Sequence, residues 1–177
     1  MIFKILDDLV NYLENEIPDR TFQLNYLPGR DVISQSTSDS IYITLLSISE
    51  DVSSKIPYVY KQDVDLKLTK QNAPIFLDLC ILISSFFTQY TEGLKAISEV
   101  IQKISDKNRF KTNELEYNIT LYNISMEQNS NLWQALSTNV LPNVIYKVRC
   151  VHIIPAADSD REATAEVNSV NIKTSGK

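Results

Sequence analysis

Apolar residues recur every three or four positions over residues 2–13, with charged residues mostly between them. This spacing predicts an amphipathic helix, which ends before Pro18. Residues 22–26 then alternate between apolar and polar types, which indicates a short strand. The β-branched and aromatic stretch over residues 40–50 predicts a longer strand.

The stretch IFLDLCILISSFF, residues 75–87, is apolar at most positions, so its periodicity fits a strand or a buried helix. We interpret it as a central strand through about Ser84, because its apolar residues suit burial on two faces. An amphipathic helix is predicted from about Thr88 to Asp106. Its apolar stripe contains Leu94, Ile97, Val100, Ile101 and Ile104.

In the following part of the chain, alternation over residues 117–121 predicts a strand. Ser125 and Gln128 have the spacing of a capping box, which opens a short helix. Residues 143–154 predict the last strand, with Lys147 and Arg149 on the face opposite its apolar residues. The residues that we expect to anchor the core are Leu94, Ile97, Leu132, Trp133, Tyr146 and Val148.

This order of elements predicts an α+β fold with one mostly antiparallel sheet. The N-terminal helix, the long middle helix and the short capped helix would pack on it. We expect a single domain over residues 1–155. Residues 156–177 are small, polar and charged, and we expect them to form a mobile C-terminal tail.

Composition excludes several functional classes. With three glycines, the chain has no glycine-rich phosphate loop, and we expect no cofactor. The net charge of −5 and the lack of Lys/Arg clusters argue against nucleic-acid binding. No apolar stretch is long enough to span a membrane, and the N-terminus does not resemble a signal peptide. The two cysteines lack disulfide or zinc spacing, so we expect a protein that folds in the cytoplasm, without a metal.

Catalysis is conceivable at one place only. His152 and Cys150 share a predicted strand face, which would suit a thiol nucleophile and its base. However, no glycine elbow or helix N-terminus accompanies them, and a buried histidine is the simpler interpretation. Asp63 and Asp65 share a strand face that could bind a cation, but a solvated face is the simpler interpretation there too. We therefore predict that the protein is not an enzyme.

Two segments suggest assembly contacts instead. One is a half-exposed strand or extended arm near residue 65, and the other is a weakly β-prone stretch in the tail. An extended segment of this kind can add a strand to a neighbour's sheet edge. The candidate contact residues are Asp63, Asp65, Lys67, Lys70, Val167, Val170 and Ile172.

Residues 74–154 resemble the N-terminal-type domain of the tail-terminator, or cap, proteins of contractile injection systems. In that family, a leucine-rich strand leads into a helix, and a strand, a short helix and a final strand follow. Residues 51–73 and the tail depart from the family pattern. The residues that carry the resemblance are Tyr90, Glu92 and Leu94, then Asn123, Ile124 and Ser125, then Asn131, Leu132, Trp133 and Leu136, and finally Pro142, Val144, Tyr146, Val148 and Arg149.

The resemblance implies a structural role. Subunits of this family form a six-fold ring at the end of a phage tail-like particle distal to the baseplate. The ring ends the inner tube and anchors the contractile sheath, so tube and sheath subunits are the implied partners. Such a protein assembles in the cytoplasm and becomes part of the particle. An adaptor or a phage tail-completion module with the same domain is the alternative; a small hydrolase using Cys150 and His152 fits less well.

Overall fold

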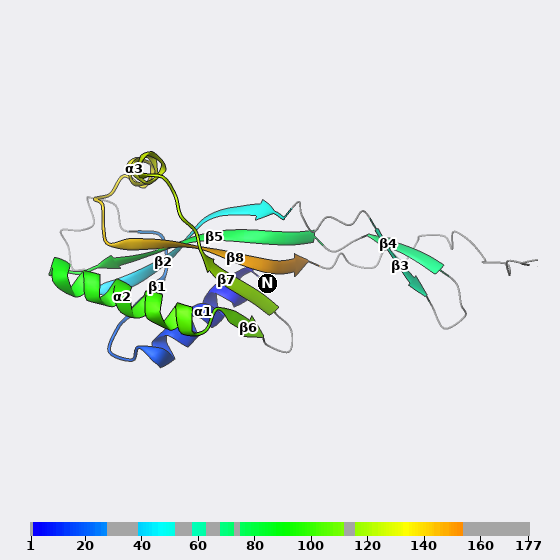
Figure 1. The fold of residues 1–177 in the computed structure, drawn as a ribbon, viewed down its shortest axis with the longest axis horizontal. Coiled ribbons are helices and arrows are strands. Elements are labelled where there is room, and N and C mark those ends of the chain that lie inside the picture. The colour runs from blue at the N-terminus through cyan, green and yellow to red at the C-terminus, as the bar shows by residue number, and fades with distance from the viewer. Residues whose placement is uncertain are drawn as a thin grey trace, which may run out of the picture. The chain divides into compact units, whose positions relative to one another are not determined.

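The computed structural model describes most of the chain as helices and strands (Figure 1). The chain divides into two compact units. Unit 1 combines Met1–Glu50 with Leu77–Val151, and unit 2 combines Asp51–Phe76 with His152–Lys177. The prediction of a single domain over residues 1–155 stays a prediction. The described residues are 2–27, 39–51, 58–62, 68–72, 75–111 and 116–153.

A six-stranded sheet with the strand order β1-β2-β5-β8-β7-β6 forms the framework of unit 1. β1 runs parallel to β2, whereas the pairs β2–β5, β6–β7 and β7–β8 are antiparallel. Together with the helices, this mixed sheet confirms the predicted α+β class. The strands are β1 (Phe22–Leu24), β2 (Ser40–Glu50), β5 (Ile75–Phe86), β6 (Arg109–Lys111), β7 (Glu116–Leu121) and β8 (Asn143–Ile153).

Helices α1 (Ile2–Glu16) and α2 (Tyr90–Asp106) cover one face of this sheet, as Figure 1 shows. Each helix turns its apolar stripe inward, because burying that stripe removes it from water. Tyr117 of β7 ties α1 to the sheet, since its buried hydroxyl donates to Asp8 Oδ2 at 2.5 Å. The main core includes Ile5, Leu9 and Leu13 of α1, Ile97, Val100 and Ile104 of α2, and Ile41, Ile43, Ile81, Ile83, Tyr117, Ile119, Tyr146 and Val148 of the sheet.

Helix α3 (Met126–Ala135) covers the other face. The predicted capping box is confirmed: Gln128 N donates to Ser125 Oγ at 3.1 Å, and Ser125 N donates to Gln128 Oε1 at 2.9 Å. The two bonds satisfy two backbone N–H groups at the start of the helix that would otherwise have no partner. The second core under α3 consists of Leu27, Tyr42, Leu82, Trp133 and Ile145.

β5 lies between β2 and β8 and is buried on both faces. Ile81 and Ile83 belong to the main core, whereas Leu82 between them belongs to the core under α3. Successive side chains of a strand point to opposite faces, so this stretch needs cover on both sides. The prediction of a central strand is therefore confirmed.

The prediction that Leu94 anchors the core is wrong, because its side chain is 44% exposed. Ile97, Trp133, Tyr146 and Val148 are buried, and Leu132 is partly buried. The reason for the error is Gly93, where a Cβ atom would lie 2.9 Å from Ser85 Oγ. Gly93 is buried against the sheet, and Leu94, one position and about 100° further round the helix, therefore lies on the flank.

Unit 2 contains, in its described part, an antiparallel hairpin of β3 (Tyr58–Gln62) and β4 (Leu68–Asn72). The sequence analysis did not predict β3, and it missed the short edge strand β6 as well. Candidate residue Lys70 lies in β4, with its Cα opposite Tyr60. The other candidate contacts, Asp63, Asp65, Lys67, Val167, Val170 and Ile172, lie outside the described residues.

Trp133 is the side chain that fixes α3 on the sheet, since it is only 3% exposed and donates through Nε1 to Asn129 Oδ1 at 3.1 Å. We predict that Trp133→Ala lowers the free energy of unfolding by about 3–5 kcal/mol, because it leaves a cavity in the core under α3. Urea denaturation followed by circular dichroism measures this change. Trp133→Phe, which keeps much of the volume, is the control. A stable Trp133→Ala protein that fails only in assembly would contradict the prediction.

Candidate assembly surfaces

One flank of α2 is fixed by charge to the loop that follows α1. The Arg20 guanidinium binds both carboxylate oxygens of Glu99, at 3.0 and 3.1 Å, and lies 3.6 Å from Glu92. It also stacks 5.5 Å from the ring centroid of Phe87. The hydrogen bond to Glu99 raises the pKa of Arg20, and burial opposes that shift. A bidentate pair of this kind fixes orientation as well as charge.

Further along α2, Lys103 continues the same charged flank. Its ammonium lies 2.9 Å from Glu16 at the end of α1, and its carbonyl accepts the Tyr12 hydroxyl at 2.9 Å. A cleft at this end of the two helices is lined in part by the paired residues Glu16, Arg20, Glu99 and Lys103. The charges of Arg20, Glu99, Lys103 and Glu16 are therefore paired within the molecule.

The opposite flank of α2 is exposed and carries no charge. At 100° per residue, its members fall within an arc of about 100° on the helix surface. Tyr90 is 65%, Leu94 44% and Ile101 38% exposed. We call this surface the α2 outer face. It consists of Tyr90, Thr91, Leu94, Ser98, Ile101 and Ser105.

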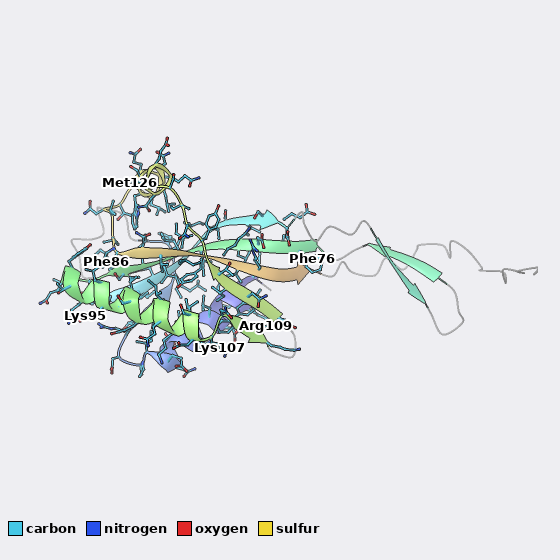
Figure 2. The ribbon with its side chains drawn as sticks, viewed as in Figure 1. Phe76, Phe86, Lys95, Lys107, Arg109 and Met126 are labelled. Carbon is cyan, nitrogen blue, oxygen red and sulfur yellow. The ribbon has the colours of Figure 1, made fainter. Side chains whose placement is uncertain are left out.

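A second charge-poor surface surrounds α3. Between Glu116 and Lys147, the only charged residue is Glu127, although 22% of the whole chain is charged. Met126 at the start of α3 is 91% exposed, and Val140 is 68% exposed. Figure 2 shows Met126 on α3, across the sheet from Lys95 of α2. We call the exposed residues from Tyr122 to Val140 the α3 surface.

The outer half of β2 is a third candidate. β1 pairs only with Ile41–Ile43, and within the described ranges no strand lies beside the outer edge of residues 45–49. A bulge between Leu45 and Ser47 distorts this edge, and Ile48 is 50% exposed. Unpaired edge groups can bind another strand, and a bulge weakens that tendency.

Cys80 is the free cysteine whose side chain the structure describes. Burial raises the pKa of the Cys80 thiol, although Lys147 and a hydrogen bond with Ser47 oppose the shift, so Cys80 is not an activated thiolate. The described residues contain no group of three metal-ligating side chains, and none of their helices is long and apolar enough to cross a membrane. Cys150 and His152 lie in β8, but their side chains are outside the described part.

The comparisons with known proteins identify the family. The Pvc16 N-terminal domain family matches residues 5–166. The chain belongs to this family. No curated protein matches it.

Two solved structures share the fold of this chain. The first is the sheath/tube terminator of an extracellular contractile injection system, PVC, in the extended state: TM-score 0.72, 17% identity, 100% of this chain and 65% of that chain covered. The second is the tube-terminating cap of the anti-feeding prophage: TM-score 0.73, 12% identity, 97% of this chain and 62% of that chain covered. The chain thus spans less than two thirds of either relative.

Sequence reasoning missed both charge-poor surfaces. The lack of charge around α3 could have been read directly from the sequence. The α2 outer face could not, because its recognition depends on knowing that Gly93 faces the sheet. Among the residues that carry the family resemblance, Tyr90 and Leu94 belong to the α2 outer face, whereas Trp133 and Tyr146 are buried.

The sheet contains an ion pair in which Lys147 Nζ, on a side chain that is 26% exposed, lies 2.6 Å from the buried Asp78 Oδ2. The Asp78 side chain is 8% exposed, and its Oδ1 has no hydrogen-bond partner in the described residues. We predict that Lys147→Met costs about 2–3 kcal/mol of stability, because the buried Asp78 carboxylate loses a partner that is itself only partly buried. Urea denaturation at neutral pH measures the loss.

The matched control is the double variant Asp78→Leu/Lys147→Met, which removes both charges. We expect its stability to lie within about 1 kcal/mol of the wild type, since apolar replacements of a buried pair are often neutral. A double variant as unstable as the single one would show that the pair itself, and not the unpaired carboxylate, determines the effect.

Proposed function

We propose that the protein is a structural subunit that terminates the tail of a contractile injection system. The observation that carries this proposal is its membership of the Pvc16 N-terminal domain family. The likeness of its fold to a sheath/tube terminator and to a tube-terminating cap supports the same role. Binding alone would perform this function.

In this proposal, the subunits form a six-fold ring at the end distal to the baseplate. The ring stops addition of inner tube subunits and holds the last layer of the sheath. A closed ring requires head-to-tail contacts between two different surfaces of each subunit. The subunits assemble in the cytoplasm and remain part of the finished particle.

Particle length tests the proposed function. We predict that particles assembled from tube, sheath and baseplate proteins without this chain have uncontrolled tube lengths or detached sheaths. Adding the chain should restore a uniform length and give six-fold density at one end. Electron microscopy measures both properties. Particles of normal length, sheathed and capped in its absence, would overturn the proposal.

The tail forms a separate part of the proposal. Residues 156–177 lie outside the described residues, and we propose that they add a strand to a neighbouring subunit or to the sheath. Ordering a segment costs about 1–2 kcal/mol per residue, so this contact needs a partner edge that is already fixed. The residues expected to make it are Val167, Val170 and Ile172.

We therefore predict that deleting the chain after Ile154 leaves the melting temperature of the isolated protein nearly unchanged and abolishes capping. Calorimetry and particle microscopy measure the two effects. A control that replaces the deleted residues by a Gly/Ser segment of equal length tests whether sequence or mere length matters. Normal particles from the truncated protein, or a large loss of stability, would contradict this prediction.

A further inference from the structure

The outer edge of β2 is only partly covered by the described sheet. β1 pairs with Ile41–Ile43, where Ile41 N donates to Thr21 O at 2.8 Å. Beyond this pairing, β2 continues beside β5 to Glu50, but within the described ranges no other strand follows it on the outer side. Backbone groups on such an edge can hydrogen-bond an added strand, so the edge itself specifies an extended partner. We call residues 45–49 the free edge of β2.

The sequence of this edge does not protect it from pairing. Natural edge strands are commonly blunted by charged residues or proline. At the opposite edge of the sheet, the short strand β6 carries the exposed Arg109 and Lys111. The free edge of β2 instead reads LLSIS, has Ile48 50% exposed, and contains neither a charge nor a proline. A bulge between Leu45 and Ser47 bends the strand beyond the end of β1, and regular pairing with β5 resumes at Ser47.

The chain itself contains a segment that matches this edge. Residues 167–172, VNSVNI, combine β-branched and polar residues and contain no charge or proline. Their central triplet, Ser169-Val170-Asn171, has the same order of polar, β-branched and polar residues as the triplet Ser47-Ile48-Ser49. Placing Val170 opposite Ile48 would put the two β-branched side chains on one face and the polar side chains on the other. Cross-strand pairs of this kind stabilise neighbouring strands.

The place of this segment in the chain favours a donor from a second copy. The free edge belongs to unit 1, whereas residues 167–172 belong to unit 2. The twelve residues 155–166 span about 40 Å when extended, which is several times the spacing between neighbouring strands. This length is sufficient to reach an adjacent subunit. A contact between the tail of one copy and the edge of the next is also head-to-tail, as a closed ring requires.

We propose that the free edge of β2 binds residues 167–172 of a neighbouring copy of this chain as an added strand. This inference rests on the proposed function, because it names the acceptor of the tail contact proposed there and assigns it to another copy of the chain instead of the sheath. Each copy then offers one donor segment and one acceptor edge, so the contact repeats from subunit to subunit until the ring closes.

Disulfide trapping between two different proteins tests the contact. One protein carries Ile48→Cys and the other Val170→Cys, both with Cys80→Ser and Cys150→Ser, so that each has a single thiol. After mild oxidation of the mixture, we expect at least tenfold more mixed disulfide dimer than from Asn15→Cys with Val170→Cys. Asn15 is exposed on α1, outside the free edge. Non-reducing gel electrophoresis and mass spectrometry measure the yield.

Hydrogen exchange tests the same contact with the native cysteines in place. We expect amide exchange in residues 45–49 to slow as the protein concentration rises, and this slowing to disappear in the chain truncated after Ile154. The variant Ile48→Lys/Ser49→Lys keeps the tail and places two charges on the exposed free edge, so it should lose the concentration dependence as well. Asn15→Lys, which adds a charge outside the edge, should behave as the wild type.

A mixed-dimer yield equal to that of the Asn15→Cys control would overturn the inference. Exchange in residues 45–49 that does not change with concentration would also overturn it, and exchange that is slow at every concentration in the full chain but fast in the truncated one would place the chain's own tail on the edge.

Particle assembly separates this inference from the proposed function. If Ile48→Lys/Ser49→Lys caps tubes normally whereas the truncated chain does not, the function stands and the assignment of the edge is wrong. If the mixed disulfide forms as expected but particles form normally without the chain, the contact stands and the function is wrong.

Discussion

The two-sided burial of β5 is the constraint on which the rest of unit 1 depends. Its alternate residues enter two separate cores, with Ile81 and Ile83 on one side and Leu82 on the other. A strand of this kind leaves apolar side chains in water unless both faces are covered. The main core receives α1 and α2, and the smaller one receives α3. The position of each helix, and hence each exposed surface, follows from this requirement.

Gly93 decides which part of α2 is left exposed. Because it approaches Ser85 closely, the helix docks through its narrowest point, and Ile97, Val100 and Ile104 follow it into the core. On the charged flank, Glu99 then pairs with Arg20, and Lys103 pairs with Glu16. The flank that remains is uncharged. The orientation of α2 therefore explains both the ion pairs that α2 makes with Arg20 and Glu16 and the lack of charge on the α2 outer face.

The local signals in the sequence were strong enough to predict most elements of unit 1. Strand β2 and the capping box at Ser125 match their patterns, because both depend on neighbours within a few residues. Leu94 was misassigned because an apolar stripe wider than the buried arc does not reveal which edge faces the core. The strand β6 was missed because three residues carry no periodicity. The surfaces could not be predicted, since a surface joins residues that only the fold brings to one side.

Absence of charge carries more information here than the presence of apolar residues. Single exposed apolar side chains are common on soluble proteins and need no partner. A stretch from Glu116 to Lys147 with Glu127 as its only internal charge is different, because the chain elsewhere uses charges freely. A surface without charges is less well solvated than the charged remainder of the chain. The same reasoning applies to the outer flank of α2, and the sheet between them holds the two surfaces apart.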